Sequence, residues 1–242
     1  MPYRRRNSLP KPGKADVGVI IAAGGTGRRM GGRVPKQFLP LGNTTILERT
    51  LALFNGHSQV CEIILVVPKD HLEKAAWLVH AGNLSRVTRV VAGGRDRQES
   101  VWNGLNAFGE SPRFILIHDA VRPLVRKQVL DAVIRQSRRY GAAVAGVRVK
   151  DTIKQEGRKG FFTKTLDRSR LWSIQTPQGF RFKLAYEAHR KARSAHFIGT
   201  DDAALVERLG RKVRIVEGDY DNIKITTAED LAFAEMVLKN RD

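Results

Sequence analysis

The stretch that decides the fold reads VGVIIAAGGTGRRM and covers residues 17–30. Its first part, residues 17–23, is almost continuously apolar, which is typical of a strand covered on both faces of a sheet. The glycines that follow allow backbone N–H groups to approach an anion without a Cβ in the way. Because ligands of an open parallel sheet bind beyond the carboxyl ends of its strands, the stretch predicts a buried first strand and a phosphate-binding loop.

Similar runs rich in valine, isoleucine and leucine recur along the chain and predict further strands. They cover residues 62–67, 86–92, 113–118, 142–147 and 212–217. Helix-start signals lie between them, in which a Thr or Asp precedes a Glu by three residues. These signals are Thr45 with Glu48, Asp70 with Glu73, and Thr226 with Glu229, and a further helix is expected from 200–202 to Gly210. The alternation predicts an α/β fold with a parallel, doubly wound sheet.

Residues 148–166 break this alternation. Two short segments, 149–154 and 161–166, flank a glycine-containing turn over 155–160, which predicts a β-hairpin. Its apolar side chains stand among many charged ones, so we expect the hairpin to project from the body. A projecting hairpin favours packing on a second subunit, whereas the alternative is a hairpin that lies on its own domain.

The composition predicts a folded protein that meets anions. The 242 residues include 43 Lys and Arg against 24 Asp and Glu, a net charge of +19, and 42% of them are hydrophobic. We expect a flexible basic tail over residues 1–16 and a single domain over 17–242. The charge favours nucleic acid, a membrane surface or phosphorylated small molecules as partners.

Other features exclude several classes of protein. The single cysteine, Cys61, excludes an intramolecular disulfide framework and a multi-cysteine zinc site, and we expect it to be a buried, inert thiol. The apolar runs are far shorter than the roughly 20 residues of a transmembrane helix, and a secretory signal is not visible. These observations predict a soluble protein of the reducing cytoplasm that does not bind a membrane.

The glycine loop matches neither of two common phosphate-binding motifs. A dinucleotide fingerprint from Gly25 needs glycine where Met30 stands, and a Walker A loop from Gly27 needs Lys and Ser or Thr where Arg33 and Val34 stand. What remains is a glycine loop with four cations, namely Arg28, Arg29, Arg33 and Lys36. Such a cluster suits several phosphates at once, although a solvated group of surface charges is the simpler alternative.

The loop and seven later segments together resemble the 2-C-methyl-D-erythritol 4-phosphate cytidylyltransferases. The segments are residues 23–30 with 35–39, 93–101, 118–123, 149–154, 166–168 with 171–172, 175–178, 200–203 and 221–224. The resemblance covers about residues 17 to 238. It implies a doubly wound, mostly parallel, Rossmann-like nucleotidyltransferase sheet in which the hairpin is a dimerisation arm, and hence a homodimer.

The resemblance implies a reaction of the non-mevalonate route to isoprenoid precursors. The family transfers a cytidylyl group from CTP to the phosphate of 2-C-methyl-D-erythritol 4-phosphate, which yields 4-diphosphocytidyl-2-C-methyl-D-erythritol and pyrophosphate. A substrate phosphate oxygen attacks in line, so catalysis consists of positioning two anions and spreading their charge. Magnesium is expected to be bound through the CTP phosphates, with few or no ligands from the protein.

The resemblance also implies roles for individual residues. The cations that stabilise the transition state at the α-phosphate are Arg29, Lys36 and Lys224. The nucleotide-binding positions are Ala22, Ala23, Gly24, Gly25, Gly94 and Ser100. The positions that hold the sugar phosphate are Asp119, Arg122, Thr176 and Thr200, together with Thr152 and Arg168, which enter the site of the neighbouring subunit. The loop is one residue longer than the shorter form of the family pattern, so Arg28 can share the role of Arg29.

Two alternatives remain open. The ribitol 5-phosphate cytidylyltransferases have the same fold and similar loops, but residues 166–172 and 200–204 look closer to the methylerythritol family. A nucleic-acid-binding protein would also explain the net charge of +19. The sequence contains no helix-turn-helix, zinc-finger or RNA-recognition signature, so we expect no specific nucleic-acid partner.

Overall fold

The computed structural model describes residues 15–24 and 35–241. Most of the expected basic tail lies outside this range, as do Gly25, Arg28 and Arg29 of the glycine loop. No helix within the described ranges is long and apolar enough to cross a membrane.

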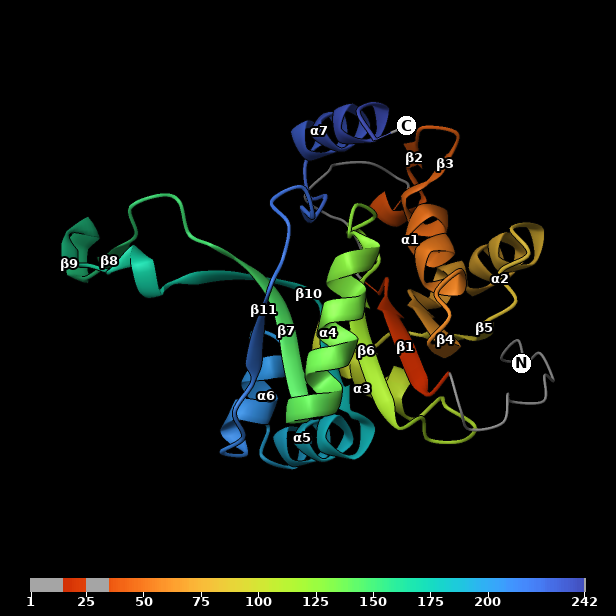
Figure 1. The fold of residues 1–242 in the computed structure, drawn as a ribbon, viewed down its shortest axis with the longest axis horizontal. Coiled ribbons are helices and arrows are strands. Elements are labelled where there is room, and N and C mark those ends of the chain that lie inside the picture. Colours follow the sequence, from red (N-terminus) through yellow and green to blue (C-terminus); the bar gives the residue numbers. More distant parts are fainter. Residues whose placement is uncertain (1–14, 25–34, 242) are drawn as a thin grey trace.

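A seven-stranded sheet forms the centre of the molecule (Figure 1). Its strand order is β11-β7-β10-β6-β1-β4-β5, and β10 alone runs antiparallel to its neighbours β6 and β7. The strands are β1 (Val17–Ala22), β4 (Val60–Val67), β5 (Val87–Ala92), β6 (Phe114–Asp119), β7 (Ala142–Arg148), β10 (Trp172–Arg181) and β11 (Arg214–Glu217). The α/β fold with a mostly parallel sheet is therefore confirmed.

The six strands that the sequence predicts are all present, with ends shifted by at most two residues. The seventh strand, β10, is the antiparallel one, and the sequence did not predict it. This strand contains Pro177 and Gly179 and lacks a continuous run of valine, isoleucine or leucine. Its pairing with β7 is interrupted between Ile174 and Gln178, so even the folded strand is irregular there.

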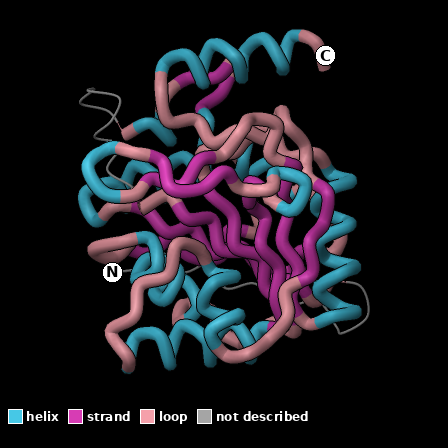
Figure 2. The backbone as a smooth tube through the Cα atoms, turned by 90° about the vertical axis from the view of Figure 1, so that its left-hand side faces the viewer, coloured by secondary structure: helices cyan, strands magenta, loops and turns pink. Residues whose placement is uncertain are grey.

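Helices cover both faces of the sheet (Figure 2). One apolar cluster joins the sheet to α1 (Ile46–Asn55), α2 (Leu72–Ala81) and α4 (Lys127–Tyr140). A second cluster on the other face joins it to α3 (Arg97–Leu105), α5 (Phe182–Ser194) and α6 (Asp202–Arg208). The last helix, α7 (Ala228–Lys239), packs on a small third cluster that includes Leu41 of β2 (Pro40–Leu41), which pairs with β3 (Thr44–Thr45).

Two of the predicted helix starts are confirmed. Thr45 and Glu48 form a reciprocal capping box at α1, in which each side chain accepts a hydrogen bond from the backbone of the other. Asp201 caps α6 by accepting from the backbone N–H of Ala204 at 2.8 Å, and Gly210 follows that helix with a φ of 71°.

The other two helix starts lie elsewhere than predicted. Asp70 lies inside a 3-10 turn, Lys69–His71, and α2 begins after it without a side-chain cap. The N-cap of α7 is Thr227 rather than Thr226, and its partner is Asp230. The carboxylate of Asp230 accepts hydrogen bonds from the backbone N–H of both threonines, which places the cap one residue later.

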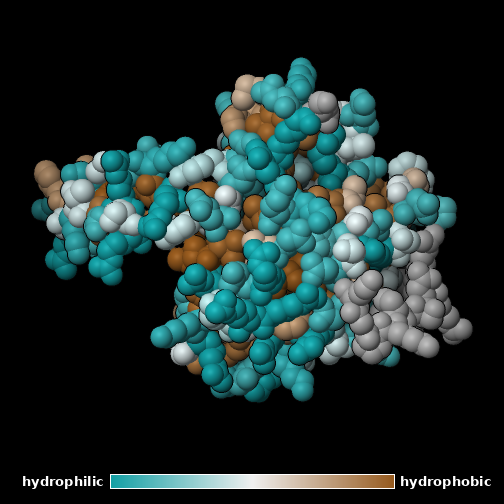
Figure 3. All heavy atoms as spheres, in the orientation of Figure 1, coloured by the Kyte–Doolittle hydropathy of each residue, from teal (hydrophilic) through white to brown (hydrophobic). Residues whose placement is uncertain are grey.

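The predicted hairpin is present and projects from the body as an arm (Figures 1 and 3). The paired strands are shorter than expected, and the first begins later in the chain. They are β8 (Lys154–Glu156) and β9 (Phe162–Thr165), which pair around a 3-10 turn. Residues 149–153 belong instead to the stem of the arm. Arg168 donates a hydrogen bond across the stem to the carbonyl of Lys150 at 2.7 Å, and the surface of the arm is mainly hydrophilic.

The unpredicted strand β10 packs closely on α4, and this contact is testable. A Cβ on Gly179 would clash with Oγ of Ser137 and lie 2.8 Å from Cγ1 of Val133, both in the buried face of α4. We expect Gly179→Ala to lower the free energy of unfolding by about 1–3 kcal/mol, because the added methyl group overpacks this contact. Urea denaturation measures the change.

Gly56→Ala is the matched control, since its nearest neighbour would be the carbonyl oxygen of Ala52 at an ordinary 3.4 Å. It should change the free energy of unfolding by no more than about 0.5 kcal/mol. Equal effects of the two substitutions would contradict the close packing of β10 on α4.

Candidate active site

The site lies where the carboxyl ends of β1 and β6 meet. Ala22, the last residue of β1, is in register with Asp119, the last residue of β6. The backbone N–H of Ala120 also donates to the carbonyl of Ala22 at 3.1 Å. The chain continues from β1 to β4 on one side while β6 lies on the other, so this is the topological switch point at which α/β sheets bind ligands.

The predicted nucleotide-binding residues that the structure describes gather at one corner of this edge. A Cβ on Gly24 would lie only 2.8 Å from Oγ of Ser100, so these two residues are in close contact. The buried hydroxyl of Ser100 donates to the carbonyl of Asp96 at 2.8 Å and accepts from the N–H of Gly94 at 3.0 Å. Ala22 and Ala23 lead directly into the same corner, so glycines and small side chains line it.

The side chain of Gln37 fixes the far end of the glycine loop. It is buried, and its amide nitrogen donates to the carbonyl of Ala23 at 2.8 Å. Gln37 lies in the 3-10 turn Lys36–Phe38, which therefore stays close to the end of β1. Lys36 is half-buried at the start of this turn.

The carboxylate of Asp119 is the centre of the site. It is buried, with 6% of its surface exposed, and three cations surround it. Oδ1 lies 3.0 Å from Nε of Arg97, and Oδ2 lies 2.9 Å from Nζ of Lys224 and 3.6 Å from Nε of Arg122. Burial raises the pKa of Asp119, but the three cations outweigh burial and hold that pKa well below its usual value. The carboxylate is therefore ionised at neutral pH.

The guanidinium of Arg122 links Asp119 to the loop that carries Lys224. Its Nη1 donates to the carbonyl of Asn222 at 2.7 Å, whereas its Nε is too far from Asp119 for a hydrogen bond and has no other partner within the described ranges. Asn222 is fully buried, and its amide donates to the carbonyl of Thr176 at 2.9 Å. These bonds hold the loop that carries Lys224 against β10.

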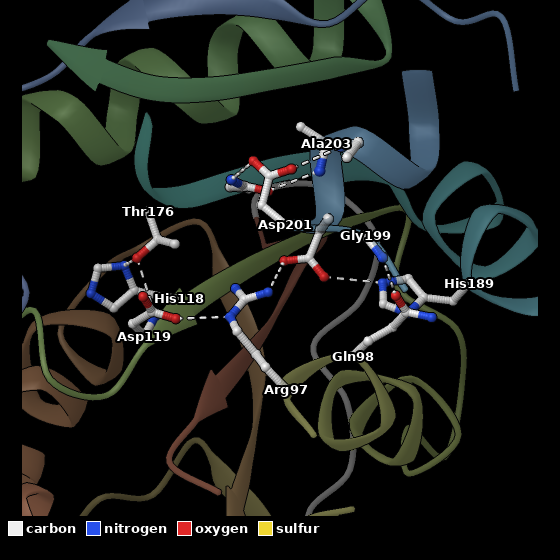
Figure 4. A network of polar contacts seen from close by, with 12 residues as sticks. Arg97, Gln98, His118, Asp119, Thr176, His189, Gly199, Asp201 and Ala203 are labelled. Carbon is white, nitrogen blue, oxygen red and sulfur yellow. Dashed lines mark hydrogen bonds and ion pairs between the residues drawn. The ribbon is translucent and has the colours of Figure 1, made fainter. Parts of the chain in front are cut away.

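Thr176 and His118 form a second, neutral layer behind Asp119 (Figure 4). His118 Nε2 lies 3.0 Å from the carbonyl of Arg122, so this nitrogen carries the proton and Nδ1 accepts from the hydroxyl of Thr176 at 3.0 Å. The same hydroxyl accepts from the N–H of Asp119 at 3.1 Å. Complete burial lowers the pKa of His118 to about 4, so the ring is neutral at pH 7.

Three residues of the site were missed at the sequence level. Arg97 reaches beyond Asp119 to Asp202, whose Oδ2 lies 2.8 Å from Nη1, and His189 Nε2 lies 3.1 Å from Oδ1 of Asp202. Arg97 and Asp202 both lie in segments that carry the family resemblance. Their charge and their place within these segments could have identified Arg97 and Asp202 as site residues. No feature of the sequence pointed to His189.

The remaining predicted residues lie apart from this centre. Thr200 is exposed just before the cap of α6, and Thr152 and Arg168 are exposed on the stem of the arm. Their roles stay predictions, as do those of Gly25 and Arg29, which lie outside the described residues. Within the described ranges, no group of three or more His, Cys, Asp and Glu side chains is placed to hold a metal ion.

The arrangement suits anionic substrates. Cations converge on one buried carboxylate beside a glycine-lined corner, and a profile of the 2-C-methyl-D-erythritol 4-phosphate cytidylyltransferases matches residues 17–240. The chain belongs to this family. A cytidylyltransferase of Geobacillus thermodenitrificans with the same family name is 47% identical over 223 residues, which cover 92% of this chain and 96% of that protein. The family member from Pelotomaculum thermopropionicum is 43% identical over 226 residues, which cover 93% of this chain and 95% of that protein.

Solved structures of cytidylyltransferases share the fold. The 4-diphosphocytidyl-2C-methyl-D-erythritol synthase of Anaerococcus prevotii superposes with a TM-score of 0.82 at 33% identity, covering 93% of this chain and 99% of that one. The 2-C-methyl-D-erythritol 4-phosphate cytidylyltransferase of Thermus thermophilus gives 0.76 at 34% identity, covering 91% and 98%. The resemblance seen in the sequence is thus confirmed, and the chain is a member of a nucleotidyltransferase family.

Because burial lowers the pKa of His118 from 6.5 to about 4, this residue makes stability depend on pH. Between these values the unfolded chain binds more protons than the folded one, so the stabilisation is complete above pH 6.5 and is lost as the pH falls toward 4. His118→Gln keeps a donor and an acceptor but does not titrate. From pH 7 to pH 5, the free energy of unfolding should therefore fall by about 2 kcal/mol more in the wild type than in this variant.

Urea denaturation at the two pH values measures the difference. His57, whose pKa burial also lowers, titrates in both proteins and cancels in the comparison. Parallel losses of stability in wild type and variant would contradict a neutral, buried His118.

Proposed function

We propose that this chain transfers the cytidylyl group of CTP to 2-C-methyl-D-erythritol 4-phosphate in the non-mevalonate route to isoprenoid precursors. A phosphate oxygen of the acceptor attacks the α-phosphorus, and the bond from that phosphorus to the bridging oxygen breaks. Pyrophosphate leaves with the electron pair, and 4-diphosphocytidyl-2-C-methyl-D-erythritol is formed. The observation that carries the proposal is the match to the family over residues 17–240.

The proposed roles divide between the two parts of the site. The corner at Ala22, Gly94 and Ser100 takes the cytidine, and its glycines and small side chains support this role. Lys36 and Lys224, with Arg29 of the loop, stabilise the charge that develops on the α-phosphate. Arg122 and Asp119 hold the sugar phosphate, and the positive charge of the Arg122 guanidinium at this edge of the sheet supports the proposal. No residue has to act as a nucleophile.

We propose that Mg²⁺ is the cofactor and that it is held mainly by the triphosphate. The side chains around the site are mostly cations, which repel a metal ion, whereas phosphate oxygens are the ligands that Mg²⁺ prefers. Bound there, the ion neutralises part of the triphosphate charge.

We propose a homodimer in which the arm of one subunit reaches the other. Two observations support it, since the arm projects from the body and its tip exposes large apolar side chains. Phe161 and Phe162 are 73% and 69% exposed. Thr152 and Arg168 at the stem would then complete the sugar-phosphate site of the partner.

We also propose that the protein acts in the cytoplasm. The sequence has a single cysteine, as expected in a reducing compartment. Burial raises the pKa of Cys61 to about 11, so it is a protonated thiol with little reactivity.

The decisive experiment measures turnover with two acceptors. Pyrophosphate release from CTP should be fast with 2-C-methyl-D-erythritol 4-phosphate and slow with ribitol 5-phosphate. The reverse order would overturn the proposed acceptor. Strong, salt-dependent binding to duplex DNA without turnover of either acceptor would instead support the nucleic-acid alternative.

The role of Lys36 gives a prediction about catalysis. Lys36→Ala should lower kcat by about 10²–10³-fold, because a preorganised charge at the transition state is lost while the fold is kept. Steady-state kinetics with CTP and the acceptor measure this change. The control is Lys191→Ala on α5, where an exposed lysine pairs with Glu187 away from the site, and its kcat should be that of the wild type. Near-normal kcat in Lys36→Ala would remove this lysine from the catalytic group.

The shared site gives a prediction about mixed dimers. Arg168→Ala and Lys36→Ala are each inactive if arm and loop serve the same site. After the two are mixed and allowed to exchange subunits, about a quarter of the wild-type activity should return, because half of the dimers are mixed and each mixed dimer has one intact site. Activity that stays at the level of the single variants after confirmed exchange would exclude a site built across subunits.

A further inference from the structure

Arg97 is held between two buried carboxylates that belong to different elements (Figure 4). Its Nε lies 3.0 Å from Asp119 at the end of β6, and its Nη1 lies 2.8 Å from Asp202 at the start of α6. We propose that Arg97 is a positioning residue for the proposed reaction: it keeps the carboxylate of Asp119 in place and ionised while the other cations turn to substrate phosphates. The inference rests on the proposed function and assigns a role to a residue that the family resemblance left without one.

The two oxygens of Asp119 have different partners. Among the ion pairs of the described residues, Arg97 alone engages Oδ1, whereas Lys224 and Arg122 both face Oδ2. Substrate phosphates that enter beside Oδ2 compete for these two cations and draw them away from the carboxylate. Arg97 is then the cation that remains in contact with Asp119.

Arg97 is itself prevented from turning. Its second nitrogen is bound to Asp202, which is 2% exposed, and Asp202 is fixed in turn by His189 of α5. The side chain of Arg97 is 29% exposed, against 39% for Lys224, which has one ion pair in the described part of the chain. The chain of contacts from β6 through α3 and α6 to α5 therefore anchors one side of Asp119 and leaves the other side free to exchange partners.

The charges around Asp119 require such an anchor. Arg97, Arg122 and Lys224 face the carboxylate, His118 beside it is neutral at pH 7, and Asp202 lies beyond Arg97. Burial raises the pKa of Asp119, so a carboxylate that lost all three cations would take up a proton or leave the site. With Arg97 in place, the substrate phosphates can take both other cations without this loss.

The experiment compares Arg97→Met, Arg97→Lys and Asp202→Asn with the wild type. In Arg97→Met, the KM for 2-C-methyl-D-erythritol 4-phosphate should rise by about 10–100-fold, while the KM for CTP stays within about twofold. The acidic limb of the profile of kcat/KM against pH should also move to higher pH, because Asp119 then binds a proton more readily. Arg97→Lys and Asp202→Asn should shift the acceptor KM in the same direction by less, since a lysine reaches only one carboxylate and an amide leaves Arg97 unanchored.

Arg138→Gln is the matched control. This arginine also bridges elements by pairing with Asp16, but it lies on α4 away from the site, and both KM values should be unchanged. A merely structural role of Arg97 would lower thermal stability and kcat while leaving the acceptor KM and the pH profile as in the wild type, and that result overturns the proposal.

Two further outcomes are distinguishable. If Arg97→Met does not fold, the test uses the other two variants, Arg97→Lys and Asp202→Asn. An unchanged KM for the acceptor in both of them overturns the proposal. If the wild type does not turn over the acceptor at all, the proposed function fails, whereas an active wild type with insensitive variants rejects the role of Arg97 alone.

Discussion

The site depends on one buried charge, the carboxylate of Asp119. A carboxylate with 6% of its surface exposed is stable only if cations replace the water it has lost, and Arg97, Arg122 and Lys224 do so from three separate parts of the chain. One anion thus gathers three cations where the carboxyl ends of β1 and β6 meet. Mutual repulsion would keep such cations apart without it, so Asp119 brings the three cations together.

The strands around Asp119 hold its carboxylate at the edge of the sheet. Asp119 ends a strand in which every residue is buried, beside the strand from which the glycine loop departs. The antiparallel strand β10 is inserted on its other side, and the interruption of its pairing with β7 is where Thr176 lies. The hydroxyl of Thr176 accepts from the backbone of Asp119 and donates to His118, so a neutral histidine fixes the backbone of Asp119 while the cations fix its side chain. The irregular part of the strand thus positions a residue of the site.

The sequence predicts those parts of the molecule that obey local rules. Six strands follow from continuous apolar runs and the capping box at Thr45 follows from spacing, and family segments located Asp119, Arg122 and Lys224. Strand β10 was not predicted because Pro177 and several polar side chains interrupt the apolar pattern of a buried strand. The role of His189 was not predicted for another reason. The sequence around a helical histidine does not indicate that it contacts a carboxylate 13 residues away in the chain. Long-range ion pairs are decided by packing, and a single sequence does not record packing.

One loop connects the site to the arm. Lys224 faces Asp119, and four residues earlier Tyr220 holds the root of the arm, where its hydroxyl donates to the carbonyl of Arg148 at 2.9 Å. The ammonium group of Lys150 also lies 3.6 Å from the centre of the Tyr220 ring. Between these two contacts the buried Asn222 attaches the loop to β10 by donating to the carbonyl of Thr176. The same few residues therefore contact both the root of the arm and the loop that carries Lys224, as a site shared between two subunits would require.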